Sequence, residues 1–383
     1  MTSLSVLGST GSIGLQTLDV VRSDPSLRVV ALAAARKWEQ VLTQAKEFSA
    51  AVIALDDPEA ASRAEREKAA FGLEHLVVLS GPQGIARCAE IDEATVVVHA
   101  VPGFAGTLPL IRALEKGKRV AFAGKEALVS AGDLIEPYLR ENPGQLVPVD
   151  SEHSALFQCL LGEDPESVAE LVLTASGGAL RDYSAERLRE VTPEEVLAHP
   201  TWKMGKKVTV DSATLVNKSL EVMEAHYLFG VPYEKLKVVI HRQSIVHSMV
   251  TFVDGSTKAQ ASVPDMSLAI SYGITYPGRR PGVVPSLSPY YGTLTFEEPD
   301  TERFPGVLLG HKAGEMGGTA PCALSYADEI LVREFLAGRI GFLDITRILF
   351  RFLETYRPKP VHSLEILREE ALRVEEKIRE LLL

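Results

Sequence analysis

Short apolar runs alternate with helical segments over the first 150 residues. Seven such runs predict strands: Leu4–Leu7, Arg28–Ala33, Ala51–Leu55, Leu76–Leu79, Thr95–Ala100, Arg119–Ala123 and Leu146–Val149. Continuous apolar strands, each followed by a helix, are typical of a parallel sheet that is covered on both faces. The pattern therefore predicts an α/β chain whose residues 1–150 form a Rossmann-like domain.

The pattern becomes less regular over residues 151–276. It predicts a helix after Ser151, strands near Leu171 and Val238, and a hairpin that pairs 248–253 with 257–263. Asp254-Gly255 between these two runs is a strong hairpin signal. We expect a central α+β domain here.

Prolines and weak periodicity mark residues 277–304, which we interpret as an extended connector. Beyond it, helical spacing returns at 327–336, 342–356 and 363–383. Residues 305–383 are therefore predicted to form a C-terminal helical bundle.

Composition narrows the class of protein. The chain has 383 residues, enough for two or three domains, and 40 basic against 51 acidic residues give a net charge of -11. That charge disfavours nucleic acid as a partner. No apolar run approaches the roughly 18 residues that a bilayer requires, so we expect no membrane partner. The three cysteines show no C-x-x-C spacing, and no targeting signal is evident, so we expect a cytoplasmic location.

A glycine-rich turn follows the first predicted strand. It runs from Gly8 to Gly14 and contains Thr10, Gly11, Ser12 and Ile13. Backbone amides at such a strand-to-helix turn can hold a pyrophosphate, and the glycines allow its close approach. We predict dinucleotide binding; the alternative is a tight turn without a ligand.

The end of the second strand indicates which dinucleotide is bound. NAD sites place a carboxylate there, whereas NADP sites accommodate the 2'-phosphate with an arginine. This chain has Arg36 and Lys37, and its first carboxylate is Glu39. NADP is favoured over NAD, with a solvated basic loop as the alternative.

Two carboxylates flank a serine after the seventh strand, as Asp150, Ser151 and Glu152. Oxygen ligands of this kind suit Mg²⁺, and Glu221 is a candidate third acid. Capping of the following helix by Asp150 or Ser151 is the competing interpretation.

The segment Asp211–Glu221 combines an amide, a cation and a carboxylate. Asp211 and Ser212 are N-cap residue types, which predicts a helix that starts there. On that helix Asn217 and Glu221 share a face, and Lys218 lies one turn before Glu221. A solvated helix surface is the alternative to a site.

Anion-binding residues occur again at Ser176-Gly177-Gly178, where a strand enters a small-residue turn. Between the two anion-binding segments lies His199–Gly205, which has little periodicity and contains Trp202. We interpret it as a lid over a ligand or, equally, as a loop above a buried tryptophan.

Taken together, the chain resembles the 1-deoxy-D-xylulose 5-phosphate reductoisomerase family. Six motifs carry the resemblance: Gly8-Ser-Thr-Gly-Ser-Ile-Gly14, Gly124-Lys-Glu126, Asp150-Ser-Glu-His153, Ser176-Gly-Gly178, His199-Pro-Thr-Trp-Lys-Met-Gly205 and Asp211-Ser-Ala-Thr-Leu-Val-Asn-Lys-Ser-Leu-Glu221. The resemblance covers nearly the whole chain. It implies an NADPH-dependent homodimer that converts 1-deoxy-D-xylulose 5-phosphate into 2-C-methyl-D-erythritol 4-phosphate with Mg²⁺ or Mn²⁺, or Co²⁺ as a third option. It also implies that residues 151–276 carry catalysis and dimerisation.

The resemblance also implies a role for each matching residue. Metal binding falls to Asp150, Glu152 and Glu221, and Lys125 joins them as a catalytic residue. Substrate-binding positions are Ser151, Ser176, His199, Trp202, Ser212, Asn217, Lys218 and His247. Cofactor-binding positions are Thr10, Gly11, Ser12, Ile13, Arg36, Lys37, Glu126, Met204 and Gly205.

Three positions depart from the family pattern. Many relatives have Asn-Lys-Glu where this chain has Gly124-Lys125-Glu126, so a cofactor contact from an asparagine is absent. Arg242 replaces a more usual proline after His241. Ala35-Arg36-Lys37 replaces Gly-Lys-Asn-like residues and keeps the basic character.

Two other functions share part of this pattern. An NADP-dependent hydroxyacid dehydrogenase would need the first domain but no three-carboxylate metal site beside a phosphate pocket. A dinucleotide-sensing regulator would bind the cofactor without turnover. Metal dependence and turnover separate these alternatives.

Overall fold

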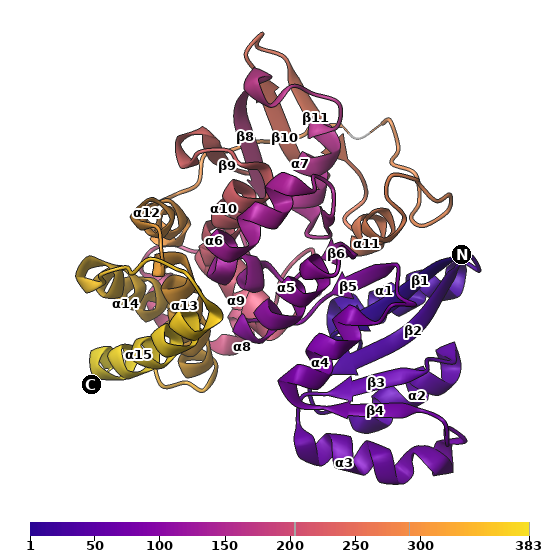
Figure 1. The fold of residues 1–383 in the computed structure, drawn as a ribbon. Coiled ribbons are helices and arrows are strands. Elements are labelled where there is room, and N and C mark those ends of the chain that lie inside the picture. Colours follow the sequence, from indigo (N-terminus) through magenta and orange to yellow (C-terminus); the bar gives the residue numbers. More distant parts are fainter. Residues whose placement is uncertain (203, 291, 383) are drawn as a thin grey trace. The chain divides into compact units, whose positions relative to one another are not determined.

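The computed structural model describes residues 1–202, 204–290 and 292–382, which fold as two compact units (Figure 1). Unit 1 consists of Met1–Ala127, Pro137–Ser154 and Asp265–Pro285. Unit 2 consists of Leu128–Glu136, Ala155–Pro264 and the described part of Ser286–Leu383. Lys203, in the predicted lid, lies outside the described residues.

Unit 1 is built on a seven-stranded sheet in the order β4-β3-β2-β1-β5-β6-β7, and every pairing is parallel. The strands are β1 (Thr2–Leu7), β2 (Leu27–Ala34), β3 (Val52–Leu55), β4 (Val77–Ser80), β5 (Val96–His99), β6 (Arg119–Phe122) and β7 (Leu146–Pro148). The predicted Rossmann-like sheet is confirmed, because each strand coincides with one apolar run.

Helices cover this sheet and bury its apolar side chains. They are α1 (Ser12–Ser23), α2 (Trp38–Phe48), α3 (Pro58–Glu67), α4 (Gly81–Glu90), α5 (Thr107–Glu115), α11 (Met266–Thr275) and the first residues of α6 (Lys125–Glu141) and α7 (Ser151–Leu160). Helix α11 packs on α1 and β6. Gly273 permits this contact, because a Cβ there would lie 2.9 Å from Val149.

The chain changes direction across the sheet between β1 and β5. From β1 it proceeds outward to β4, and from β5 it proceeds the other way to β7. The carboxyl ends of the two strands separate at such a point and leave a crevice for a ligand. The amide of Ala100 donates to Leu7 O at 2.9 Å there, so Gly8 begins the glycine turn beside the end of β5.

Unit 2 contains a four-stranded sheet in the order β11-β10-β8-β9. Its strands are β8 (Val168–Ala175), β9 (Leu236–Ile240), β10 (Val246–Phe252) and β11 (Thr257–Ala261). β10 and β11 form the predicted antiparallel hairpin, while β8 and β9 run parallel. The α+β prediction is confirmed.

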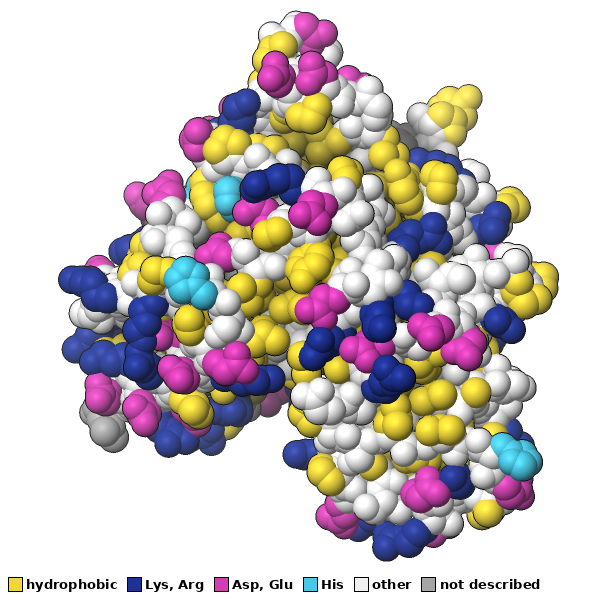
Figure 2. Space-filling view, in the orientation of Figure 1, with side chains coloured by type: hydrophobic (Ala, Val, Ile, Leu, Met, Phe, Trp, Pro, Cys, Tyr) yellow, Lys and Arg dark blue, Asp and Glu magenta, His cyan; other side chains and the backbone are white. Residues whose placement is uncertain are grey.

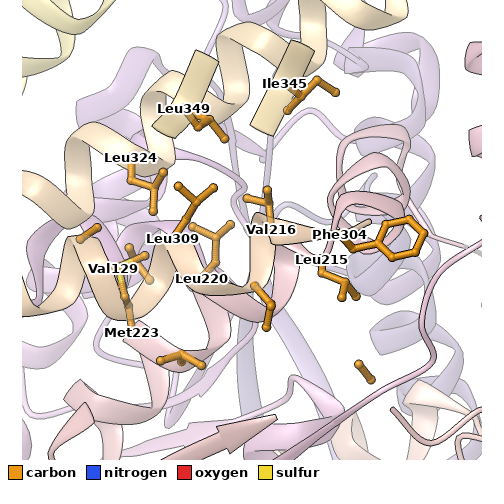
Figure 3. Packing of buried hydrophobic residues seen from close by; sticks show 14 of the residues in the cluster. Val129, Leu215, Val216, Leu220, Met223, Phe304, Leu309, Leu324, Ile345 and Leu349 are labelled. Carbon is orange, nitrogen blue, oxygen red and sulfur yellow. The ribbon is translucent and has the colours of Figure 1, made fainter. Parts of the chain in front are cut away.

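Helices make up most of the remaining unit 2. They are α8 (Pro193–Leu197), α9 (Lys206–Thr214), α10 (Val216–Phe229), α12 (Leu309–Met316), α13 (Ala320–Leu336), α14 (Phe342–Thr355) and α15 (Leu364–Leu382). Figure 3 shows Leu220 and Met223 of α10 in one apolar cluster with Leu309 of α12 and Leu324 of α13. Helix α10 is therefore a buried helix, and the predicted helical bundle is confirmed.

The predicted single helix from Asp211 onward is wrong in its start. Asp211 and Ser212 lie in the last turn and a half of α9, not at an N-terminus. Leu215, with φ of 60°, ends α9 and separates it from α10. A leucine in the left-handed region carries no sequence signal, so the break was not predictable from residue type.

The surface carries mixed charge. Figure 2 shows Lys and Arg side chains lying among Asp and Glu on the visible faces of both units. Within the described part of the chain, no helix combines the length and the apolar character needed to cross a membrane.

Candidate active site

The glycine turn forms a tight cradle at the start of α1. Gly8 has φ of 85°, and a Cβ there would lie 2.2 Å from Ala100 O. A Cβ on Gly14 would lie 2.2 Å from Gly8 O, so the turn tolerates no side chain at either position. Gly11 is the N-cap and supplies no side-chain cap to the first turn. The amides of Ser12 and Ile13 therefore lie where a helix N-terminus binds anions.

The basic residues after β2 lie next to this turn. Lys37 Nζ donates to Thr10 O at 3.5 Å, and Arg36 lies 3.3 Å from Asp57 with 83% of its side chain exposed. Gly8 and Ser9 both donate backbone N–H groups to Ala33 O, which fixes the end of β2 against the turn. The residues predicted to bind the pyrophosphate and the 2'-phosphate are thus neighbours.

A second polar group lies at the carboxyl ends of β6 and β7. Lys125 Nζ is 2.5 Å from Asp150 Oδ2, and both side chains are largely buried. Ser151 Oγ donates to Glu152, and Glu152 N lies 3.4 Å from Asp150 Oδ1. The carboxylate of Asp150 therefore accepts from the first turn of α7, as the capping interpretation predicts, and metal binding stays a prediction.

In unit 2, Glu221 is held by its own helix. Asn217 Nδ2 donates to Glu221 Oε1 and Lys218 Nζ to Oε2, each at 2.5 Å. The side chain of Glu221 is 1% exposed and that of Lys218 is 5% exposed. The predicted convergence of amide, cation and carboxylate on one side of α10 is confirmed as geometry.

Ser176 follows β8 and lies beside the end of α9. Gly178, with φ of 76°, packs against that helix, where a Cβ would lie 2.6 Å from Ser212 O. The Gly178 amide donates to Ser176 Oγ at 3.2 Å. Arg181 donates to Ser176 O at 2.7 Å and thereby stabilises the turn.

The predicted lid contacts this turn through His199. Its Nε2 lies 3.1 Å from Ser176 Oγ, and its Nδ1 accepts from the amides of Thr201 and Trp202 at 3.1 and 2.9 Å. Since Nδ1 accepts, the proton is on Nε2, which donates to the serine. Burial and the nearby Arg181 lower the pKa of His199, so the ring is neutral near pH 7.

Trp202 and His247 face each other with ring centroids 6.3 Å apart. Trp202 is half-buried, as is Met204, while Gly205 is exposed. His247 Nε2 lies 2.8 Å from Ser262 Oγ, and burial lowers the pKa of His247 to about 4. The predicted lid thus places the half-buried indole of Trp202 beside a neutral imidazole.

Comparison with known proteins identifies the family. A family model of 1-deoxy-D-xylulose 5-phosphate reductoisomerase matches residues 4–132. Two models of the C-terminal domains of this enzyme match residues 146–229 and 261–381. The reductoisomerase of Chlorobaculum tepidum is 47% identical over 367 residues, which is 95% of each chain. The chain belongs to the 1-deoxy-D-xylulose 5-phosphate reductoisomerase family.

Other members of the family agree. The Heliobacterium modesticaldum reductoisomerase is 46% identical and covers 96% of this chain and 94% of its own. A solved DOX-P reductoisomerase in complex with NADPH, fosmidomycin and magnesium superimposes with a TM-score of 0.93 at 35% identity, over 100% of this chain and 97% of that one. The Zymomonas mobilis enzyme in complex with NADPH gives 0.91 at 36% identity, over 100% and 99%.

The structure accounts for one departure from the family pattern. Arg242 Nη1 lies 2.7 Å from Asp182 and Nε lies 3.0 Å from Glu297. The turn itself is held by His241, whose Nδ1 lies 2.8 Å from Thr295 O. Without the proline, side-chain contacts fasten this turn to residues 293–297.

Sequence reasoning missed two residues that support the family's site motifs. Arg181 holds the Ser176 turn, and Ser262 holds His247. Ser262 contacts His247 from 15 positions away, whereas Arg181 contacts Ser176 from five positions away in the same turn. The position of Arg181 three residues after Gly178 was therefore the only signal that the sequence offered.

Proposed function

We propose that this chain carries out the reaction of its family, the rearrangement and reduction of 1-deoxy-D-xylulose 5-phosphate to 2-C-methyl-D-erythritol 4-phosphate in non-mevalonate isoprenoid biosynthesis. It is an NADP-dependent oxidoreductase that also uses a divalent metal. The observation that carries the proposal is family membership over nearly the whole chain together with all six motifs. Four of the motifs follow a strand, His199–Gly205 precedes α9, and Asp211–Glu221 spans the end of α9 and the first turns of α10.

The cofactor half of the proposal assigns NADPH to unit 1. The cradle between Gly8 and Gly14 fits a pyrophosphate, because it offers amides and excludes side chains. Arg36 and Lys37 are assigned to the 2'-phosphate, and Thr10 to Ile13 to the pyrophosphate. Glu126, Met204 and Gly205 are assigned to the rest of the cofactor.

The metal half assigns a divalent cation to Asp150, Glu152 and Glu221. Three carboxylates fit Mg²⁺ or Mn²⁺, and Co²⁺ as a third option, by their hard oxygen donors. When bound, the metal would polarise the substrate carbonyl and NADPH would supply the hydride. Lys125, 2.5 Å from Asp150 Oδ2, places a cation beside that carboxylate and orients it.

The remaining residues bind and orient the substrate. We assign Ser176, Ser212, Asn217 and Lys218 to its phosphate, and Ser151 and His247 to its carbon chain. His199 and Trp202 close the site and exclude water. Contacts to the phosphate supply remote binding energy that orients the reacting end.

One assay tests this function against its alternatives. NADPH oxidation should require both 1-deoxy-D-xylulose 5-phosphate and Mg²⁺ or Mn²⁺, and should stop in EDTA. A hydroxyacid dehydrogenase would oxidise NADPH without the metal, and a regulator would bind NADPH without turnover.

A second comparison tests the phosphate pocket. The unphosphorylated sugar should react at least about a hundredfold less efficiently, since it lacks several charge-assisted hydrogen bonds. Equal use of both sugars would contradict the pocket.

We also propose that the enzyme is a homodimer and works in the cytoplasm, as the family resemblance and the three free cysteines favour. Light scattering after size exclusion should give twice the chain mass of 41.6 kDa. A mass of one chain at assay concentration would contradict the dimer.

A further inference from the structure

His99, the last residue of β5, has its imidazole ring in a slot between two glycines. A Cβ on Gly106 would lie 2.8 Å from His99 Cε1, and a Cβ on Gly124 would lie 2.6 Å from both Cε1 and Nδ1. The ring is fully buried and lies 5.4 Å from that of Phe122, centroid to centroid. Any side chain at position 124 would start in the space that this ring occupies.

Space, not backbone conformation, requires the glycine at position 124. Gly124 has φ of -96° and ψ of 65°, a conformation that other residues adopt. Since an L-residue is not excluded by φ, its neighbours exclude it: chiefly the imidazole, and also Val101 O, which would lie 3.0 Å from the Cβ. Within this chain the imidazole of His99 therefore stands in exchange for a side chain at position 124, because the two cannot occupy the same space.

The ring also places a hydrogen-bond acceptor, Nδ1, beside Gly124. His99 Nε2 lies 2.8 Å from Gly106 O, and because a carbonyl only accepts, Nε2 carries the proton. Burial lowers the pKa of His99 to about 4, so Nδ1 keeps its lone pair at neutral pH. Among the described residues Nδ1 has no hydrogen-bond partner.

The slot lies on the side of the crevice that the nicotinamide half of the cofactor reaches. β5 pairs with β1 and with β6, and Ala100, which follows His99, contacts Gly8 of the cradle. A dinucleotide lies across the change of direction between two such halves of the sheet. The 2'-phosphate residues follow β2, so the other half of the cofactor extends toward β5, β6 and Gly124.

We propose that His99 is a positioning residue for NADPH: its buried ring occupies the space of a side chain at position 124 and so fixes Gly124 in the conformation that binds the cofactor. His99 thereby sets the start of α6, where Lys125 and Glu126 follow Gly124. The inference rests on the proposed function, because it assumes that NADPH occupies unit 1.

A double-mutant cycle tests the exchange. Gly124→Asn should raise the dissociation constant for NADPH, measured by its fluorescence, at least about tenfold, because the new side chain displaces the ring. His99→Ala should raise it as well, since it empties the slot. The double variant H99A/G124N should return to within about threefold of the parent. The KM for the sugar phosphate should change far less than NADPH affinity in all three.

Gly81→Asn is the matched control. A Cβ at Gly81 meets nothing within 4 Å, and asparagine is among the residues that tolerate its φ of 72°, so this variant should bind NADPH as the parent does. If Gly124→Asn alone binds like the parent, or if the double variant is no better than Gly124→Asn, the exchange is refuted.

A smaller change guards against loss of folding. Gly124→Ala adds only the Cβ that would lie 2.6 Å from the ring, and its thermal midpoint should fall while that of H99A/G124A recovers. If the thermal midpoint of H99A/G124A falls by the sum of the two single-variant decreases, the two residues are independent and the inference is overturned. This result does not depend on measuring enzyme activity. Failure of the parent itself to bind NADPH would overturn both proposals, whereas turnover by the parent without coupling in the cycle would overturn this one alone.

Discussion

Glu221 shows how one residue is prepared for its proposed role. Burying a carboxylate is costly unless it is paired and hydrogen-bonded, and Asn217 and Lys218 each donate to one of its oxygens. Both partners come from the preceding turn of α10, so the local helix fixes the carboxylate. A rigid, charged oxygen pair of this kind suits a hard cation.

The first prediction compares two glutamates on α10. Glu221→Gln should lower kcat at least about a hundredfold with 1-deoxy-D-xylulose 5-phosphate and Mg²⁺, because it removes ligand charge but little volume. Glu224→Gln changes a buried glutamate one turn further along and should keep most of the activity. NADPH binding and far-UV circular dichroism should match the parent in both. If Glu224→Gln lowers kcat more than Glu221→Gln does, Glu221 is not the metal ligand.

The second prediction concerns Arg36. Arg36→Asp should raise the KM for NADPH about tenfold or more and leave that for NADH nearly unchanged, since it replaces a charge-assisted contact with repulsion. Steady-state kinetics with both cofactors measure the effect. Arg63→Asp, an equal charge change on exposed α3, is the control. If the ratio of the KM for NADPH to the KM for NADH is similar in both variants, Arg36 is excluded from the cofactor site.

At the scale of elements, the ion pairs of Lys207 anchor the helix that follows the predicted lid. Lys207 Nζ lies 2.6 Å from Asp211 and 2.7 Å from Asp328 of α13. Both carboxylates are buried, so the first turn of α9 is fixed to the helical bundle. Motion of the loop would therefore end at Gly205, which is exposed and is the N-cap of α9.

The third prediction is that His199–Gly205 orders over a bound ligand. In a Trp38→Phe variant only Trp202 retains indole fluorescence. Fosmidomycin with Mg²⁺ and without NADPH should change that emission and protect the loop from proteolysis, because closure excludes water from the indole. The double variant W38F/W202F should lose the optical signal but keep the protection. Tight binding without either change would mean that the loop is static.

Helix α12 illustrates how packing overrides propensity. The sequence analysis did not predict it, since Gly310 and Gly314 lower helix propensity. A Cβ on Gly310 would lie 2.4 Å from Ser219 O, and one on Gly314 would lie 2.2 Å from the ring of Tyr233. Gly310 lets α12 approach α10 closely, Gly314 leaves space for the ring of Tyr233, and burial of Leu309 stabilises the helix.

At the scale of the whole molecule, the proposed cofactor residues up to Glu126 lie in unit 1, and the proposed phosphate residues lie in unit 2. Each unit also buries a histidine in the neutral state, His99 in unit 1 and His247 in unit 2. The stability of the whole chain should therefore depend on pH.

The fourth prediction is a loss of stability in mild acid. Burial lowers the pKa of both histidines from 6.5 to about 4, so the unfolded chain gains protons first as the pH falls. Their contribution is fully present above about pH 6.5 and is lost as the pH falls toward 4, by about 2 kcal/mol for each histidine at pH 5. Thermal unfolding between pH 5 and 7.5 measures it.

Single variants show which histidine causes the pH dependence of stability. His247→Asn should flatten the decline in thermal midpoint, whereas His75→Asn, at an exposed position, should leave it unchanged. A parent midpoint that does not fall between pH 6.5 and 5 would show that the two rings are not held neutral.

The sequence by itself determined the strands and the family. Seven apolar runs coincide with seven parallel strands because a strand buried on both faces needs consecutive apolar residues. Hairpin chemistry at Asp254-Gly255 and the i, i+4 spacing of Asn217 and Glu221 are also local, so they were predicted correctly. The roles of the site residues remain predictions that the experiments above test.

Only the tertiary structure decided the features that join distant segments. The glycines of α12 each depend on a neighbour far away in the chain, Gly310 on Ser219 and Gly314 on Tyr233. His99 and Gly124 are separated by 24 positions, and nothing local to either one predicts that a ring will lie where a side chain would begin. Local propensity and periodicity act over a few residues, whereas steric exclusion acts between whichever residues the fold brings together.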